Sequence, residues 1–171
     1  MVSATFNGKA LHDPQANRVY RWETNWGPLW DGQWWTLRET RACFRIICDQ
    51  YRVPLPKVQM RPRRNGWYSY AHWLDDDPVD YVAFSRRGLN PVATLHEAAH
   101  VIAQYAAGRF EEPHGRLWMG VYLRLLVDNS VAPWCALRAS LAGTGIAYRP
   151  LRFCGPRQIE KMACAYGRNV V

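Results

Sequence analysis

The sequence lacks any long apolar run. No stretch approaches the ~20 apolar residues that a membrane-spanning helix needs, and the opening residues, MVSATFNGKALHDPQ, contain no apolar signal core. These absences predict a protein that does not enter a membrane and is not exported, so we expect a cytoplasmic location. Hydrophobic residues make up 49% of the 171-residue chain and charged residues 21%. That composition excludes a disordered chain and suits one folded domain.

Cysteine is scarce and shows no motif. The five cysteines are an odd number, and no two of them form a CxxC pair. We therefore expect neither a disulfide framework nor a separate zinc ribbon. We interpret most of the cysteines as buried thiols in a reducing compartment, so no sulfur ligand is expected for a metal ion.

Acidic residues are outnumbered by basic ones. Fourteen Asp and Glu stand against 22 Lys and Arg, which gives a net charge of +8. This balance favours a polyanionic partner, with DNA or another nucleic acid first, although a basic surface that only maintains solubility explains it equally well. The arginines that we assign to nucleic-acid binding are Arg61, Arg63, Arg64, Arg86 and Arg87.

Tryptophan is concentrated in residues 1–35, which we interpret as an N-terminal arm packed on the domain. Four of these tryptophans, from Trp22 to Trp34, are spaced by four as on a helix face, but Gly27 and Pro28 interrupt the run. We therefore predict an irregular arm whose indoles cover part of the domain. The alternative is a platform on which unpaired bases stack.

Residues 36–171 have the pattern of an α+β domain. Thr36 and Glu39 form a capping box that begins a helix, and the RNG tripeptide between the first two β candidates is a hairpin signal. The DDDP stretch predicts a turn before the third β candidate. Strands are predicted at 57–63, 67–73 and 80–86, and helices at 36–53, 90–108, 116–129, 132–145 and 155–167.

The stretch LHEAAH carries the strongest chemical signal. His96 and His100 are one helical turn apart, so their imidazoles project from the same face and can bind one ion. Glu97 is offset around the helix axis and can reach a water beside the ion, which is why HExxH marks zinc hydrolases. With five His and six Glu, a chain of this length contains HExxH by chance about once in two hundred cases.

A catalytic zinc needs a third protein ligand and an open position. The metzincin pattern requires glycine and histidine where this chain has Ala103 and Ala106, and the thermolysin pattern requires a downstream helical glutamate that is missing. Glu111 and Glu112 are available in the connector, but His114 is the best candidate because a short connector can return it to the ion.

HEAAH, a connector and then HGRLW resemble the SprT-like zincins, in which HExxH precedes a third histidine that opens a helix. The likeness spans roughly residues 36–127. It implies a compact zincin-like domain with a small antiparallel-type sheet packed on the HExxH helix, and here a C-terminal helical extension within 36–171. It also implies that His96, His100 and His114 bind zinc and that Glu97 is the general base. The family includes Spartan, which cleaves proteins crosslinked to DNA, so DNA-associated protein substrates are implied.

These observations predict a zinc-dependent metallopeptidase with one Zn²⁺ per chain and a protein or peptide substrate. The segment ending near Ser85 is expected to offer an edge for an extended peptide. The donor that stabilises the oxyanion stays open among several tyrosines and arginines, with Tyr122, Tyr105 and Tyr148 as candidates. One alternative is a non-catalytic nucleic-acid-binding module with a structural zinc. Another is a zinc hydrolase that acts on a different bond.

Overall fold

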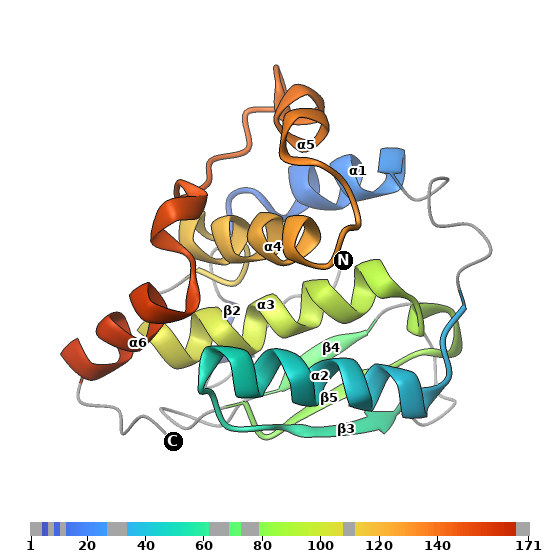
Figure 1. Cartoon of the computed structure of the whole chain (residues 1–171). Helices are drawn as coiled ribbons and strands as arrows, with labels where there is room; N and C mark the ends of the chain where they lie inside the picture. Colours follow the sequence, from blue (N-terminus) through green and yellow to red (C-terminus); the bar gives the residue numbers. More distant parts are fainter. Residues whose placement is uncertain are drawn as a thin grey trace.

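The computed structural model describes residues 5–6, 9–10, 13–26, 34–61, 69–72, 79–107 and 112–166. In these residues the chain is a mixed α+β domain (Figure 1). The helices are α1 (Ala16–Trp26), α2 (Leu37–Tyr51), α3 (Pro91–Ala107), α4 (Arg116–Asp128), α5 (Trp134–Leu141) and α6 (Pro156–Ala165). The strands are β1 (Thr5–Phe6), β2 (Lys9–Ala10), β3 (Lys57–Met60), β4 (Tyr70–His72) and β5 (Tyr81–Phe84), with 3₁₀ turns η2 (Arg86–Gly88) and η4 (Leu151–Phe153).

The main sheet has the strand order β3-β5-β4 and is mixed, which corrects the expected antiparallel-type sheet. β3 runs parallel to β5, with Met60 beside Phe84, whereas β4 runs antiparallel to β5, with His72 beside Tyr81. The predicted hairpin between the first two strands is therefore wrong, because β3 and β4 lie on opposite sides of β5. The segment that ends near Ser85 is β5, which lies between β3 and β4. The expectation that this segment offers a free sheet edge to a peptide is therefore also wrong. The predicted turn at 75–78 lies outside the described residues.

The central position of β5 follows from its composition. Val82, Ala83 and Phe84 are all fully buried, and a strand that is apolar on both faces is best covered in the middle of a sheet. β3 and β4, each with more accessible side chains, form the two edges. Tertiary packing, and not the local turn signals, determines which strands pair when they are far apart along the chain.

α2 begins and ends at the signals that the sequence provides. The Thr36 hydroxyl accepts from the Glu39 amide at 3.2 Å, and the Glu39 carboxylate accepts from the Thr36 amide at 2.6 Å, which is the predicted capping box. The helix ends where Arg52 adopts a left-handed conformation with φ of 52°. Phe44 and Ile47 face the core.

α3 is the central helix of the molecule. Asn90 caps it by accepting from the Ala93 amide at 2.9 Å, and every residue from 94 to 107 is buried. In Figure 1 it lies between α4 on one side and α2 with the sheet on the other. A helix that is covered all round has the apolar composition of a core element. The polar His96, Glu97 and His100 within it therefore need partners.

The expected irregular arm is a helix over residues 16–26. Trp22 is 4% exposed, donates its indole N–H to the Ser140 hydroxyl at 2.9 Å, and meets the Tyr122 ring edge-on at 6.3 Å. Gly27 and Pro28, which lie outside the described residues, follow the end of α1. Trp34 by contrast is 60% exposed. The regular spacing of the tryptophans thus marked a real helix over its first part.

The three C-terminal helices were predicted and are confirmed as α4, α5 and α6. α4 packs closely against the segment that precedes η4, because a Cβ at Gly120 would lie 2.5 Å from the carbonyl oxygen of Arg149. The Arg149 amide in turn donates to the Arg116 carbonyl at 2.7 Å. All five cysteines lie in described residues, and none forms a disulfide.

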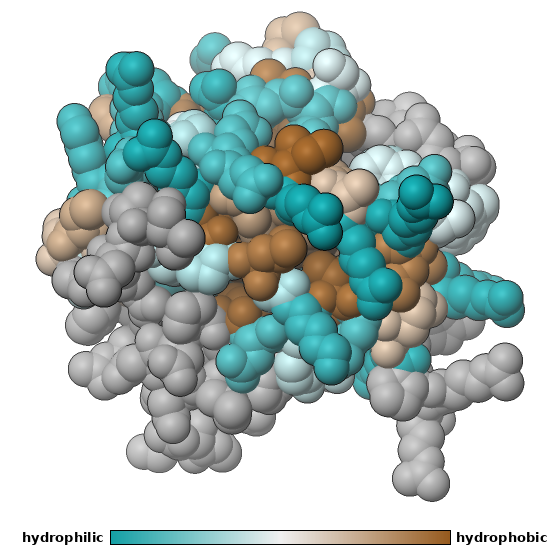
Figure 2. All heavy atoms as spheres, turned by 60° about the horizontal axis from the view of Figure 1, so that its bottom comes forward, coloured by the Kyte–Doolittle hydropathy of each residue, from teal (hydrophilic) through white to brown (hydrophobic). Residues whose placement is uncertain are grey.

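Figure 2 views the molecule with the lower side of Figure 1 turned forward. Brown apolar atoms gather near the middle of this face, with teal hydrophilic side chains around them. The exposed large apolar residues of α2, β3 and the loop between them are Ile46, Leu55 and Met60. Among the described helices, none has the length and apolar character that crossing a membrane requires.

Candidate metal centre

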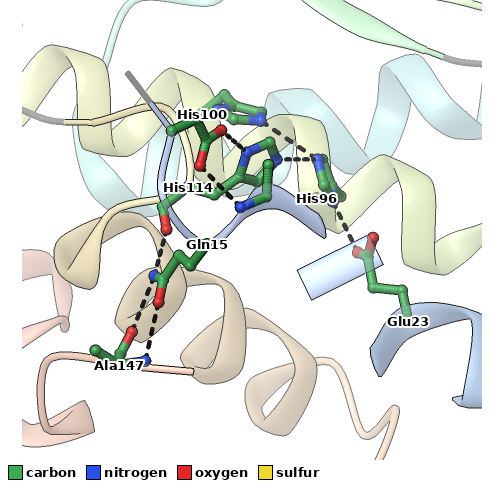
Figure 3. A network of polar contacts seen from close by, with 8 residues as sticks. Gln15, Glu23, His96, His100, His114 and Ala147 are labelled. Atoms are coloured by element: carbon green, nitrogen blue, oxygen red, sulfur yellow. Dashed lines mark hydrogen bonds and ion pairs between the residues drawn. The ribbon is translucent and has the colours of Figure 1, made fainter. Parts of the chain in front are cut away.

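Three histidines from two neighbouring elements converge in the interior. His96 and His100 lie one turn apart on α3, and His114 lies two residues before α4, with Gly115 as the N-cap between them. All three are buried. Figure 3 shows the imidazoles of His100 and His114 pointing toward that of His96. A potential ligand atom of each lies within 4.8 Å of the others.

The separations are those of ligands on one ion. The Nε2 atom of His96 is 3.3 Å from the Nε2 atoms of both His100 and His114. A tetrahedral ion with Zn–N distances of about 2.0–2.1 Å separates its ligand nitrogens by about 3.3–3.4 Å. The three histidines can therefore hold a metal ion without rearrangement of the His96 contacts.

Two carboxylates bind the opposite sides of two of these rings. Glu23 accepts from His96 Nδ1 at 2.7 Å, and Asp13 accepts from His114 Nδ1 at 2.5 Å. An ionised carboxylate only accepts, so each Nδ1 carries a proton, and a ring in the neutral form then presents its Nε2 lone pair to the cluster. Lone pairs 3.3 Å apart repel one another unless a cation or a proton lies between them. This hydrogen-bond pattern favours a cation site.

The backbone at His114 is fixed by a glutamine. The Gln15 amide group donates to the His114 carbonyl and, at 3.1 Å, to the Ala147 carbonyl, and its oxygen accepts from the Ala147 amide at 2.9 Å. Figure 3 shows this bridge between the His114 turn and the segment after α5. Gln15, Asp13 and Glu23 are residues that the sequence reasoning missed. An Asp–Pro pair at 13–14, typical of a helix start, was the available signal.

Aromatic rings surround the imidazoles. Trp118, fully buried on α4 one turn beyond His114, lies 4.5 Å from the His114 ring centroid, 4.8 Å from His96 and 5.1 Å from His100. Tyr20 of α1 stacks on His96 at 6.0 Å and meets His114 edge-on at 5.0 Å. The tryptophan of the HGRLW motif therefore packs directly against all three candidate ligands.

Glu97 is buried beside β4. It is 4% exposed, and its Oε2 atom has no hydrogen-bond partner within the described part of the chain. Burial raises the pKa of Glu97 to about 7. The charge of His96 opposes this rise, Glu23 adds to it, and a backbone hydrogen bond from Ala71 opposes it. An unsatisfied carboxylate oxygen in a dry site needs a proton, a water or a ligand.

Burial and the paired charges set the protonation of the histidines. Burial lowers the pKa of His100 well below its usual value, and the neighbouring imidazoles lower it further. Burial also lowers the pKa of His114, against the hydrogen bond of Asp13. Burial acts in the same direction on His96, but the charge and hydrogen bond of Glu23 outweigh it and raise the pKa. His100 and His114 are thus held in the neutral form that binds metals.

The other candidates fall in different places. The centroid of the Tyr122 ring lies 5.5 Å from that of His96. The Tyr122 hydroxyl is buried near Glu23, but it has no hydrogen bond of ordinary geometry within the described residues. Tyr105 is buried, and Tyr148 packs against Trp134. Glu112 is exposed, and Glu111 lies outside the described residues.

Three of the five proposed nucleic-acid-binding arginines lie at one end of the sheet. The Arg61 amide donates to the Phe84 carbonyl at 2.8 Å, so Arg61 follows β3 where Arg86 and Arg87 follow β5. Arg86 and Arg87 are exposed, and Arg61 places its guanidinium 5.4 Å from the Tyr70 ring. Arg63 and Arg64 lie outside the described residues.

Comparisons of the chain with protein-family models, with curated proteins and with solved structures find no match.

Proposed function

We propose that this protein is a zinc-dependent hydrolase that cleaves peptide bonds, with His96, His100 and His114 as ligands and Glu97 as the general base. One observation carries the proposal, the convergence of three imidazole nitrogens next to a buried glutamate. Imidazole nitrogens suit zinc among the common biological metals. Three protein ligands leave the fourth tetrahedral position for reactants, as in catalytic zinc sites.

The chemistry divides between the ion and the chain. Bound zinc would supply Lewis-acid catalysis, which polarises a carbonyl and acidifies water. Glu97 would accept the proton of the attacking water at Oε2, the oxygen with no partner in the described residues, and deliver it to the leaving amine. Trp118, packed on the imidazoles, keeps bulk water away from the inner side of the ligand cluster.

An edge strand supports a peptide as the substrate. β4 is at the end of the strand order and contributes the Ala71 backbone hydrogen bond to Glu97. An extended peptide that adds to an edge strand gains main-chain hydrogen bonds without a requirement for particular side chains. Such a peptide along β4 would pass beside the base. This role replaces the one first expected for the segment near Ser85.

The second candidate function is a nucleic-acid-binding module with a structural zinc. The arginines gathered at the end of β3 and β5 favour it. Structural zinc sites are closed by four protein ligands, whereas the described residues offer three that converge. Glu97 also has no role in a structural site. A hydrolase that acts on another bond shares the same metal centre and differs only in substrate.

Metal analysis of the purified chain tests the proposal. We expect about one zinc per chain, with nitrogen and oxygen but no sulfur neighbours in X-ray absorption. Hydrolysis of an unfolded protein substrate should stop when a chelator removes the metal and return when zinc is added. Zinc–sulfur scattering, a chain that retains no metal, or chelator-resistant cleavage would contradict the proposal.

A further inference from the structure

We infer that residues 13–26 belong to the metal centre, with Asp13 and Glu23 as positioning residues for His114 and His96, so that metal binding and docking of α1 are coupled. This inference rests on the metal site proposed above. It assigns a function to a segment that the sequence motif does not include.

The contacts come from both ends of one short segment. Asp13 precedes α1 and Glu23 lies in its last turn, and the two reach histidines 101 and 73 residues further along the chain. Both carboxylates are largely buried, with side-chain exposures of 17% for Asp13 and 15% for Glu23. Tyr20, between them in sequence, places its ring against the same two imidazoles.

Each carboxylate binds the ring nitrogen that faces away from the ligand cluster. Holding the proton on Nδ1 selects the tautomer whose Nε2 can coordinate, and it fixes the plane of the ring. The carboxylates thus orient the nitrogens of His96 and His114, which lie 3.3 Å apart, toward the ligand cluster. Loss of such a partner typically weakens metal binding about 10–100-fold.

The coupling follows from charge. Docking α1 places two carboxylates in a poorly hydrated site, which is unfavourable unless a positive charge compensates. A divalent cation between the imidazoles supplies that charge. Whatever free energy the carboxylates add to metal binding, the metal adds to docking of α1, because linkage is reciprocal. Trp22 of α1, which is buried against Tyr122 of α4, reports on docking.

Asp13 allows a selective test because its two oxygens have separate roles. Oδ1 accepts from the Ala16 amide at 3.0 Å and caps α1, while Oδ2 binds His114. Asn is as good an N-cap as Asp. In Asp13→Asn, the side-chain oxygen can still accept from the Ala16 amide. The NH₂ group then faces the Nδ1–H of His114, and two donors cannot form a hydrogen bond. The substitution therefore removes the contact to the metal ligand with little effect on the helix start.

The experiment compares zinc affinity, measured by competition with a chromogenic chelator, in the wild type, Asp13→Asn, Glu23→Gln and two matched controls. The controls are Asp128→Asn and Glu160→Gln, whose carboxylates pair with arginines away from the site. We expect an affinity loss of about 10–100-fold in each test variant and none in the controls. Urea unfolding of the zinc-free proteins identifies a purely structural role, which would lower stability and leave affinity unchanged.

Hydrogen exchange on the wild type gives an independent readout if a variant does not fold. Amides of α1 should exchange more slowly with zinc than after chelation, while those of α2 should change little. Equal exchange of α1 in both states, or test variants that bind zinc as tightly as the controls, would overturn the inference and leave the three-histidine site standing. A wild type that binds no zinc would instead remove the site itself and the inference with it.

Discussion

His114 shows how a single residue in a turn becomes part of a buried site. Its ring is held by Asp13 and Trp118, and its carbonyl accepts from Gln15. The next residue, Gly115, is the N-cap of α4 and lets the turn pass directly into the helix. The histidine is thus fixed by contacts from two parts of the chain, the segment that precedes α1 and α4.

Replacing His114 by alanine should weaken zinc binding by more than the ~10–100-fold expected for an outer-shell partner, because it removes a ligand. Competition with a chelator measures the change, and Glu160→Ala is the control because Glu160 pairs with Arg52 away from the site. The rate of hydrogen exchange of the backbone amides around residue 114 should also rise. If His114→Ala binds zinc as tightly as the wild type while a Glu111 or Glu112 variant does not, the third ligand is a glutamate of the connector.

Among the elements, the close packing of α4 on the segment that leads to η4 supports the candidate metal centre. Gly120 allows this approach, and the Arg149 amide bonds to the Arg116 carbonyl near the start of α4. Ala147, two residues earlier, is bound by Gln15, which also binds His114. Gln15 therefore links this segment to the turn that contains His114.

Gly120→Ser should lower the free energy of unfolding by about 1–3 kcal/mol, because the new Cβ would meet a backbone oxygen that can move only with its segment. Urea unfolding followed by circular dichroism measures the loss. The matched control is Gly155→Ser, where the nearest atom to the new Cβ is the side-chain oxygen of Gln158 at 3.2 Å and serine is a good N-cap. Equal stability of the two variants would mean that α4 and the Arg149 segment are less closely packed.

For the whole molecule, local signals predicted α2 to α6, whereas α1 was expected to be irregular, and long-range contacts decided what the sequence alone left open. The capping box at Thr36 and the Asn90–Pro91 start are set by neighbouring residues, so α2 and α3 could be placed in advance. The sheet order could not, because β3 pairs with a strand more than twenty residues away. In the site, the HExxH spacing and His114 were predictable, whereas Asp13 and Glu23 became neighbours only through docking of α1.

The basic charge of the molecule gives a further prediction. If DNA is a partner, its binding should weaken steeply with added salt, and the triple substitution of Arg61, Arg86 and Arg87 by glutamine should reduce the slope of log K against log salt by up to about 3, roughly 0.9 for each lost phosphate contact. Fluorescence anisotropy at several salt concentrations measures this slope. Undetectable binding at low salt would leave the charge as a property of solubility. An equal change in an Arg157→Gln, Lys161→Gln control on α6 would contradict the assigned position.

In the proposed function, Glu97 acts as the base beside a metal ion held by three histidines. The most direct measurement is the rate of hydrolysis of an unfolded protein by the wild type and by Glu97→Gln, both loaded with the same amount of zinc. Gln fills the same space but cannot accept the proton, so we predict equal zinc content and a rate lower by ~10²–10⁴. A zinc-loaded Glu97→Gln protein that cleaves as fast as the wild type would contradict the account.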